Sequence, residues 1–402
     1  MSKEIKTYEL SADGGNTKVK VIYKDKFTSY DNIYAKDSAI DYDAMNLTEE
    51  DMDENLRDVL NVRFTWHSGE EDEIKQEFLF GELALNNKSD LDERVNADKS
   101  DDIMINMVTI LSGVNFIIEE MGKKELKEEL EFNLRLSTGL PYHEYKIRSL
   151  REQYGKHFKG THIIENLDPR YPVKKITVHI NDVIVKSEGM SALETIIKSK
   201  EVVTEETKDS VIDTVWSIID IGGFTTDIVG GIFRQRKSGF KLETIDRLGV
   251  GKKYGISSAQ NNAIANMISS YQSEGKVKST FRVTRKEINA AEMREGQYKG
   301  IINNKFNTNT TEFTTEEYKK LGRTIGNDFT QLFIQNEQMD SLRKIYIAGG
   351  GAYNKVVVDE LVSELTRRGF DEEIVEVVDS PNPVYVNAVG YYLDLQKEKE
   401  ME

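Results

Sequence analysis

The sequence contains no cysteine and only five histidines. The absence of thiols excludes cysteine nucleophiles, thiolate zinc sites, iron–sulfur clusters and disulfide bonds. The histidines show no metal-ligand spacing, so we expect no histidine-based metal site; they are His67, His143, His157, His162 and His179. The N-terminus has no apolar leader segment and no run approaches about 18 apolar residues, which predicts a cytoplasmic protein that does not contact a membrane.

Basic residues are fewer than acidic ones. The chain has 54 lysines and arginines against 70 aspartates and glutamates, which gives a formal net charge of −16. This balance argues against nucleic acid or an anionic membrane surface as the direct partner. The length of 402 residues suggests two or three domains of about 150 residues each.

Strand-like segments occur in the same pattern in two parts of the chain. The first part begins with predicted strands at 8–12, 18–23 and 27–34, and the second part restarts with predicted strands at 215–219, 228–233 and 241–245. Each group is followed by a peripheral insert, which is acidic at 36–106 and polar and mostly helical at 256–320. We therefore expect an internal duplication of architecture.

Apolar periodicity and turn residues predict the other elements. Helices are expected at 107–121, 191–200, 354–368 and 386–396. Strands are expected at 134–136, 344–347 and 373–378. The segment 77–85 is expected to form a strand that runs into a short helix. Two further strand-like runs within 174–187 meet at Asn181-Asp182.

Two similar motifs stand at the ends of predicted strands. The first is Asp13-Gly14-Gly15-Asn16-Thr17, and the second is Asp220-Ile221-Gly222-Gly223-Phe224-Thr225-Thr226-Asp227. In each, an aspartate precedes glycines whose turn can present backbone N–H groups to phosphate oxygens. Such aspartates can hold the waters around a Mg²⁺ that bridges phosphates. Either motif alone could be an ordinary tight hairpin, but one motif in each half of a duplicated pattern favours a phosphate site.

A third motif joins a predicted strand to three glycines. The apolar run 345–348 leads into Gly349, Gly350 and Gly351, where a flat ring or a phosphate can approach the backbone closely. The segment Gly249-Val250-Gly251-Lys252-Lys253 is not a P-loop, because the required earlier glycine is absent and Lys253 stands where Ser or Thr would bind Mg²⁺.

Taken in order, the three motifs resemble the phosphate and adenosine loops of the actin–Hsp70–sugar-kinase superfamily. Within it, the chain is similar to the ParM-type bacterial actins that segregate plasmids, on the stretches 78–84, 137–141, 183–189 and 385–390. The resemblance implies an α/β, actin-like fold of two duplicated ribonuclease-H-like domains, each with a peripheral subdomain, and a nucleotide in the cleft between them. Domain I would comprise 1–187 plus 386–402, and domain II 188–385.

The resemblance also implies roles for individual residues. Asp13 and Asp220 would organise Mg²⁺ through water. The β-phosphate would be held by Gly14, Gly15, Asn16 and Thr17, and the γ-phosphate by Gly222, Gly223 and Thr225. The family's turn above the phosphates would include Gly249, and the adenosine would be lined by Gly349, Gly350 and Gly351. The family's phosphate-binding lysine falls on Lys20, and Lys18 remains an alternative because it lies on the same face of the strand.

Glu188 lies after a predicted strand and before a predicted helix. The resemblance makes it the catalytic residue that orients or deprotonates the attacking water, together with Asp13 and Asp220. Hydrolysis needs a carboxylate in this role. The alternative is an ordinary acidic residue at a helix N-terminus, where the helix dipole favours it.

The function implied by the resemblance is an actin-like ATPase, with GTP as the other possible nucleotide. It would polymerise head-to-tail with Mg-ATP, disassemble after hydrolysis and drive plasmid segregation through a centromere-binding adaptor protein. Head-to-tail contacts do not close on themselves and so generate filaments. Alternatives in the superfamily are a small-molecule kinase or phosphohydrolase, an Hsp70-like chaperone domain and a chromosomal cell-shape actin. The sequence shows no substrate motif for the first and no apolar membrane-binding segment for the last.

Overall fold

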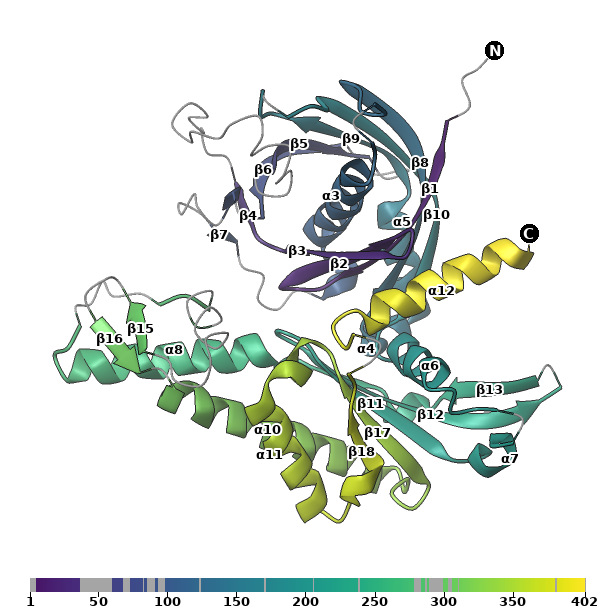
Figure 1. The fold of residues 1–402 in the computed structure, drawn as a ribbon, viewed down its shortest axis with the longest axis vertical. Helices are drawn as coiled ribbons and strands as arrows, with labels where there is room; N and C mark the ends of the chain where they lie inside the picture. Colours follow the sequence, from purple (N-terminus) through teal and green to yellow (C-terminus); the bar gives the residue numbers. More distant parts are fainter. Residues whose placement is uncertain are drawn as a thin grey trace. The chain divides into compact units, whose positions relative to one another are not determined.

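The computed structural model divides into two compact units, Met1–Thr195 with Tyr385–Glu402, and Ile196–Val384, called unit 1 and unit 2 (Figure 1). The division falls within helix α6 (Met190–Ser199). The structure describes residues 5–36, 60–67, 73–81, 83–84, 91–92, 98–122, 124–169, 171–204, 206–237, 239–277, 283–285, 288, 299–302, 306–309, 311–379 and 382–401. The acidic run at 49–54 and most of the one at 69–73 lie outside these residues.

Unit 1 is built on one large sheet. Among the described residues its strand order is β3-β2-β1-β8-β10-β9-β5-β6-β4-β7. The strands are β1 (Thr7–Gly14), β2 (Lys18–Tyr23), β3 (Lys26–Asp31), β4 (Tyr34–Lys36), β5 (Leu60–Trp66), β6 (Ile74–Phe80), β7 (Leu91–Asp92), β8 (Glu129–Leu140), β9 (Gly160–Asn166) and β10 (Lys175–Ser187). The central strands β1, β8 and β10 run parallel, so their carboxyl ends lie at one edge of the sheet.

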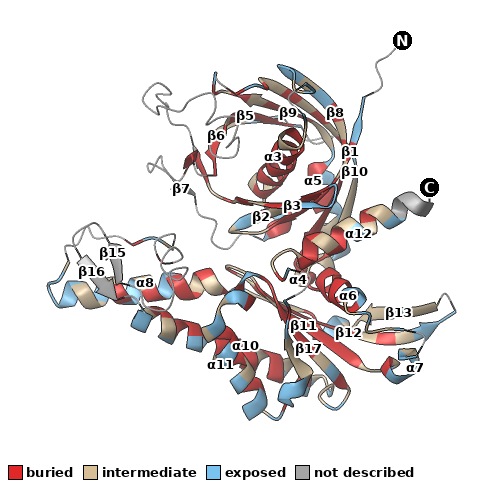
Figure 2. Ribbon diagram, in the orientation of Figure 1, coloured by how far each residue is buried: buried red, intermediate tan, exposed pale blue. Residues whose placement is uncertain are grey.

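The sheet of unit 1 curls around helix α3 (Ile103–Glu119), which is buried along most of its length (Figures 1 and 2). Apolar side chains on several sides of α3 favour this central position. Gly113 lets α3 approach β1, since a Cβ there would lie 2.4 Å from Leu10 Cδ2. Further helices in the described part of unit 1 include η1 (Lys99–Asp101), α4 (Tyr142–Tyr145), α5 (Arg148–Phe158) and α12 (Val386–Met401).

Unit 2 has a smaller sheet with strand order β13-β12-β11-β17-β18, and β14 also pairs with β12. The strands are β11 (Val215–Ile221), β12 (Thr226–Arg236), β13 (Gly239–Thr244), β14 (Val250–Lys252), β17 (Leu342–Ala348) and β18 (Val375–Val377). Its described helices include α7 (Lys208–Val211), η2 (Asp246–Leu248), α8 (Ile256–Ser273), α10 (Thr311–Gln335), η3 (Gly350–Tyr353), α11 (Lys355–Arg367) and η4 (Glu372–Ile374). Phe329 and Phe333 of α10 stack in the core at 4.4 Å between ring centroids.

The two sheets repeat one arrangement. In unit 1, β3-β2-β1-β8-β10 are neighbours, and in unit 2 β13-β12-β11-β17-β18 are neighbours in the same order. In unit 1, β1 is antiparallel to β2 and parallel to β8. In unit 2, β11 is likewise antiparallel to β12 and parallel to β17. The predicted duplication of architecture is therefore confirmed in the described part of the chain.

Several predicted elements differ from the observed ones. The predicted strand 27–34 is divided between β3 and β4. The two runs predicted within 174–187 form one strand, β10, with a bulge between His179 and Asp182. The insert at 256–320 was expected to be mostly helical, but it also contains the hairpin of β15 (Lys299–Ile302) and β16 (Phe306–Asn309). Strands β5 and β9 and helix α5 were not predicted. No helix in the described ranges is long and apolar enough to cross a membrane.

Candidate functional site

The first glycine motif forms the turn between β1 and β2. Asp13 lies near the end of β1, opposite Lys20 of β2, and is 3% exposed. The Gly15 N–H donates to the carbonyls of Asp13 (3.1 Å) and Lys18 (3.0 Å). The side-chain amide of Asn32 donates to the Gly15 carbonyl at 2.8 Å. These bonds hold the turn tightly, with the Asp13 carboxylate at its base.

The two candidate lysines of β2 make different contacts. Lys20 Nζ lies 2.8 Å from Asp13 Oδ2 and its side chain is 19% exposed. Lys18 Nζ instead pairs with Asp31 of β3 at 2.7 Å, and that side chain is 49% exposed. The geometry favours Lys20 as the lysine of this turn, because Lys20 contacts the buried aspartate while Lys18 is directed to the neighbouring strand.

Glu188 follows β10 and is tied to the sheet through its backbone. Its N–H donates to the carbonyl of Leu140 at the end of β8, at 2.8 Å. The next residue, Gly189, has φ 70°, and its N–H donates to Asn387 Oδ1 at 3.0 Å. The chain turns here before helix α6 begins. The Glu188 side chain is 13% exposed and forms an ion pair with Lys99.

Lys99 completes a cluster of four charged side chains in unit 1. Its Nζ also lies 3.7 Å from Asp13 Oδ1, and its side chain is 8% exposed. Burial alone would raise the pKa of the Asp13 carboxyl, but the Lys20 and Lys99 ammonium groups outweigh it and hold this pKa below its ordinary value. The cluster therefore contains two carboxylates, Asp13 and Glu188, balanced by two ammonium groups.

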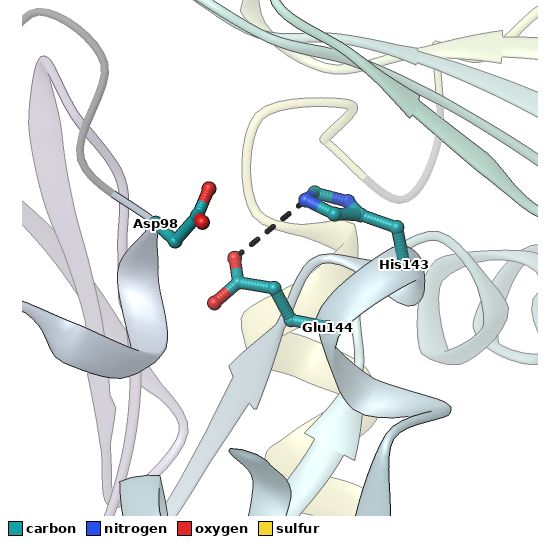
Figure 3. A group of neighbouring side chains, drawn as sticks. All are labelled: Asp98, His143 and Glu144. Atoms are coloured by element: carbon teal, nitrogen blue, oxygen red, sulfur yellow. Dashed lines mark ion pairs between the residues drawn. The ribbon is translucent and has the colours of Figure 1, made fainter.

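Glu144 of α4 holds the backbone that carries Lys99. Its Oε1 accepts from the Lys99 N–H at 3.1 Å and its Oε2 from the Ser100 N–H at 2.7 Å. Figure 3 shows Glu144 beside Asp98 and His143. Each of the three residues has one side-chain oxygen or nitrogen that could bind a metal ion, and these three atoms lie within 4.8 Å of one another. Because both Glu144 oxygens already accept backbone hydrogen bonds, the grouping is explained by the folding of η1 and needs no metal ion.

The second glycine motif forms the turn between β11 and β12 in unit 2. Asp220 lies near the end of β11, and the Gly222 N–H donates to the Thr225 carbonyl at 2.8 Å. The carbonyls of Gly222 and Gly223 accept from the first backbone N–H groups of α8, at 3.1 and 2.7 Å. A Cβ added to Gly255, before α8, would lie 2.4 Å from the Gly222 carbonyl oxygen. Glycine at 255 is therefore part of the same turn.

The third glycine motif packs directly on the second. Gly349 has φ 83°, and a Cβ there would lie 2.2 Å from Asp220 Oδ1. A Cβ on Gly351 would lie 2.3 Å from Ile221 Cγ2, whereas a Cβ on Gly350 would meet nothing within 4 Å. Gly249 ends η2 and precedes β14, which pairs with β12 opposite Asp227. The motifs predicted around residues 220, 249 and 349 therefore lie together in unit 2.

Comparison with known proteins identifies the fold. No family model and no curated protein sequence matches the chain. A 15-stranded ParM filament from Clostridium botulinum matches with a TM-score of 0.67 and 18% identity, covering 98% of this chain and 100% of that one. The actin-like protein Alp7A matches with a TM-score of 0.71 and 17% identity over 98% of both chains. Bacillus thuringiensis ParM with ATP matches with a TM-score of 0.62 and 17% identity, covering 98% of this chain and 99% of that one.

The chain has the ParM-type actin-like fold. The fold class predicted from the three glycine motifs is thereby confirmed. In this actin-like fold the duplicated five-strand pattern places Asp13 and Asp220 at equivalent positions, near the carboxyl end of the first strand of each sheet.

Two residues at the site were not predicted from the sequence. Lys99 lies in the segment 36–106, which composition indicated only to be a solvated acidic insert, and Glu144 lies in a short helix with no motif. Nothing in the local pattern marks Lys99 as buried, because its position depends on η1 meeting the strand ends of β1 and β10. The sequence signal closest to Glu144 is the 137–141 stretch that precedes it.

Proposed function

We propose that the chain is an actin-like ATPase that assembles into filaments with Mg-ATP. The observation that carries this proposal is the Asp13–Lys20 pair at the turn of a glycine hairpin, in the same cluster as Glu188. An ionised aspartate, a lysine and a turn rich in backbone N–H groups are the components of a metal–phosphate site. The turn after Asp220 adds a second aspartate followed by a glycine turn.

The residues present fit a nucleotide and a magnesium ion. Asp13 is held ionised by its lysines, as a carboxylate that orders metal-bound water must be. We assign the β-phosphate to the turn of Gly14, Gly15, Asn16 and Thr17 with Lys20, and the γ-phosphate to the turn of Gly222, Gly223 and Thr225. Gly349, Gly350 and Gly351 would border the adenosine, where Gly350 leaves open space. Mg²⁺, when bound, offsets the charge of the phosphate oxygens.

Glu188 is the proposed general base. Its carboxylate would accept a proton from water as the water oxygen bonds to the γ-phosphorus and the bond to the β–γ bridging oxygen breaks. ADP then leaves with the bridging oxygen, and phosphate carries the oxygen of the water. The position of Glu188 beside Asp13, through their shared contact with Lys99, supports this assignment.

Filament formation is supported by the ParM filament among the matching structures. We propose head-to-tail assembly, because a heterologous contact repeats without closing. Right-angle light scattering with Mg-ATP, with Mg-ADP and without nucleotide tests this. A rise with Mg-ATP alone is expected. Flat scattering together with tight ATP binding would contradict the filament proposal and favour a small-molecule kinase.

We further propose that the filament segregates plasmid DNA through a centromere-binding adaptor. The net charge of −16 supports an indirect contact with DNA, since the chain lacks the basic excess of a DNA-binding protein. A test is the retention of a plasmid that encodes this chain when Glu188→Gln replaces the natural residue. Rapid plasmid loss is expected, and unchanged retention would contradict the role.

A further inference from the structure

Lys99 is a buried cation between two carboxylates. Its Nζ pairs with Glu188 and lies 3.7 Å from Asp13 Oδ1, and its side chain is 8% exposed. Burial alone would lower the pKa of the Lys99 ammonium, but Glu188, Tyr154 and Asp13 outweigh this and raise its pKa above the ordinary value. Lys99 is therefore charged at every pH at which the protein works.

Both members of the Lys99–Glu188 pair are anchored to the end of β8. The Glu188 N–H donates to the carbonyl of Leu140, the last residue of β8, at 2.8 Å. Glu144 accepts from the Lys99 N–H at 3.1 Å, and its own N–H donates to the carbonyl of Pro141 at 3.0 Å. Leu140 and Pro141 are consecutive. The backbones that carry the two charges are thus held at the same strand end, and such fixed supports help to preorganise a reactive group.

Stability alone is a weak reason for this pair. Taking two charges out of water costs about as much as their attraction returns, so a buried ion pair contributes little net stability. The pair also stands beside Asp13 and Lys20, in the cluster assigned to phosphates. Its location indicates a role in the chemistry of that cluster.

We propose that Lys99 is a positioning residue for Glu188, which it keeps ionised and oriented toward the attacking water. This inference rests on the proposed function, because it takes Glu188 as the base. The ion pair with Lys99 would fix the Glu188 carboxylate, which then accepts the proton of the water. Glu144 acts one step further away, by fixing the backbone of Lys99.

The charges around the pair determine what loss of Lys99 does. The cluster is faced by Asp13 on β1, Lys20 on β2, Glu144 on α4 and Tyr154 on α5, and burial raises the pKa of Tyr154 to about 12, so its phenol stays neutral. Without Lys99, Asp13 would keep its ion pair with Lys20, whereas Glu188 would lose the ammonium group of its ion pair. A proton on Glu188 then becomes more favourable, so its carboxyl must titrate at a higher pH.

Carbon-13 NMR of carboxyl-labelled glutamate tests this without nucleotide, with the Glu188 signal assigned from its loss in Glu188→Gln. In Lys99→Met we expect its titration midpoint to rise by about 1 to 3 pH units. Lys99→Arg keeps the charge and should stay near wild type. The control Lys26→Met removes an exposed ion pair with Glu120 in the same unit and should change nothing. An unchanged midpoint in Lys99→Met would overturn the inference.

Phosphate release gives the second readout. In Lys99→Met the acidic limb of the pH–rate profile should move to higher pH, and kcat should fall about tenfold or more while KM changes little. Lys99→Arg should restore part of the rate.

An active wild type with an unchanged Lys99→Met profile overturns the inference, whereas a wild type that releases no phosphate defeats the proposed function itself. If Lys99→Met does not fold, Glu144→Gln decides: a smaller shift in the same direction supports the inference, and no shift overturns it.

Discussion

Gly349 lies so close to Asp220 that a Cβ on Gly349 would come within 2.2 Å of Asp220 Oδ1. The glycine after β17 and the aspartate near the end of β11 are 129 residues apart in the sequence, yet the parallel pairing of these strands brings them together. With φ 83°, residue 349 also has a backbone conformation that side chains rarely adopt. The site of unit 2 therefore depends on glycine at this position for two separate reasons.

Gly349→Ala should destabilise the chain by about 1–3 kcal/mol, from backbone strain and from the contact with Asp220. Urea unfolding measures the loss. The neighbouring variant Gly350→Ala is the matched control, since its Cβ would meet nothing within 4 Å, and it should change stability by less than about 0.5 kcal/mol. Equal effects of the two variants would contradict the packing described for this loop.

Lys20→Met should weaken Mg-ATP binding about 10- to 100-fold. The estimate follows from about 1.5–3 kcal/mol for a hydrogen bond to a charged group. Lys18→Met should have little effect, because Lys18 pairs with Asp31. Isothermal titration calorimetry of both variants decides between the two lysines, and a larger loss in Lys18→Met would reverse the assignment.

Glu188→Gln should leave ATP binding and assembly intact and slow phosphate release by about 100-fold or more, the usual contribution of a general base. Glutamine keeps the shape of the side chain but cannot accept the proton. A single-turnover assay with bound ATP measures the chemical step directly. Normal release in this variant would move the role of base to another residue.

His162 should make folding stability depend on pH. Burial lowers its pKa to about 4, its ring stacks on Trp66, and Nε2 bonds to the Phe158 carbonyl. An unfolded histidine takes up a proton near pH 6.5, so stability is complete above that pH and falls as the pH drops toward 4.

The expected loss for His162 between pH 7.5 and pH 5 is about 2 kcal/mol, at roughly 1.4 kcal/mol for each pH unit below 6.5. Urea unfolding of wild type and His162→Gln at both pH values isolates this contribution. The variant should lose about 2 kcal/mol less than wild type over the same interval. An identical pH dependence in the two proteins would contradict a neutral, buried His162.

The sequence predicts best the elements whose signals are local. Strand β2 has the expected bounds, and the turns at Gly15 and Gly222 lie where an aspartate and glycines follow apolar runs. Strand β8 was expected to span only 134–136 but begins at Glu129, because polar residues alternate with buried ones along its first half. The alternation is present in the sequence, but the many charged residues of this segment weaken it as a strand signal.

The remaining parts depend on contacts between distant segments. Strand β5 follows an acidic segment and is recognisable only through its pairing with β6 and β9. Lys99 is buried because Glu144 binds its backbone and Glu188 its side chain, 45 and 89 residues away. A charged residue in a charged segment gives no sign of such burial. The catalytic candidates could be predicted from motifs, but the residue that positions one of them could not.

The most direct test of an ATP-driven filament is a time course that records light scattering and phosphate release together after Mg-ATP is added. Scattering should rise first, phosphate should follow, and scattering should decline as phosphate accumulates. In Glu188→Gln the rise should persist without decline. Phosphate release with no scattering at any protein concentration, or scattering that is equal with Mg-ADP, would contradict a filament driven by ATP.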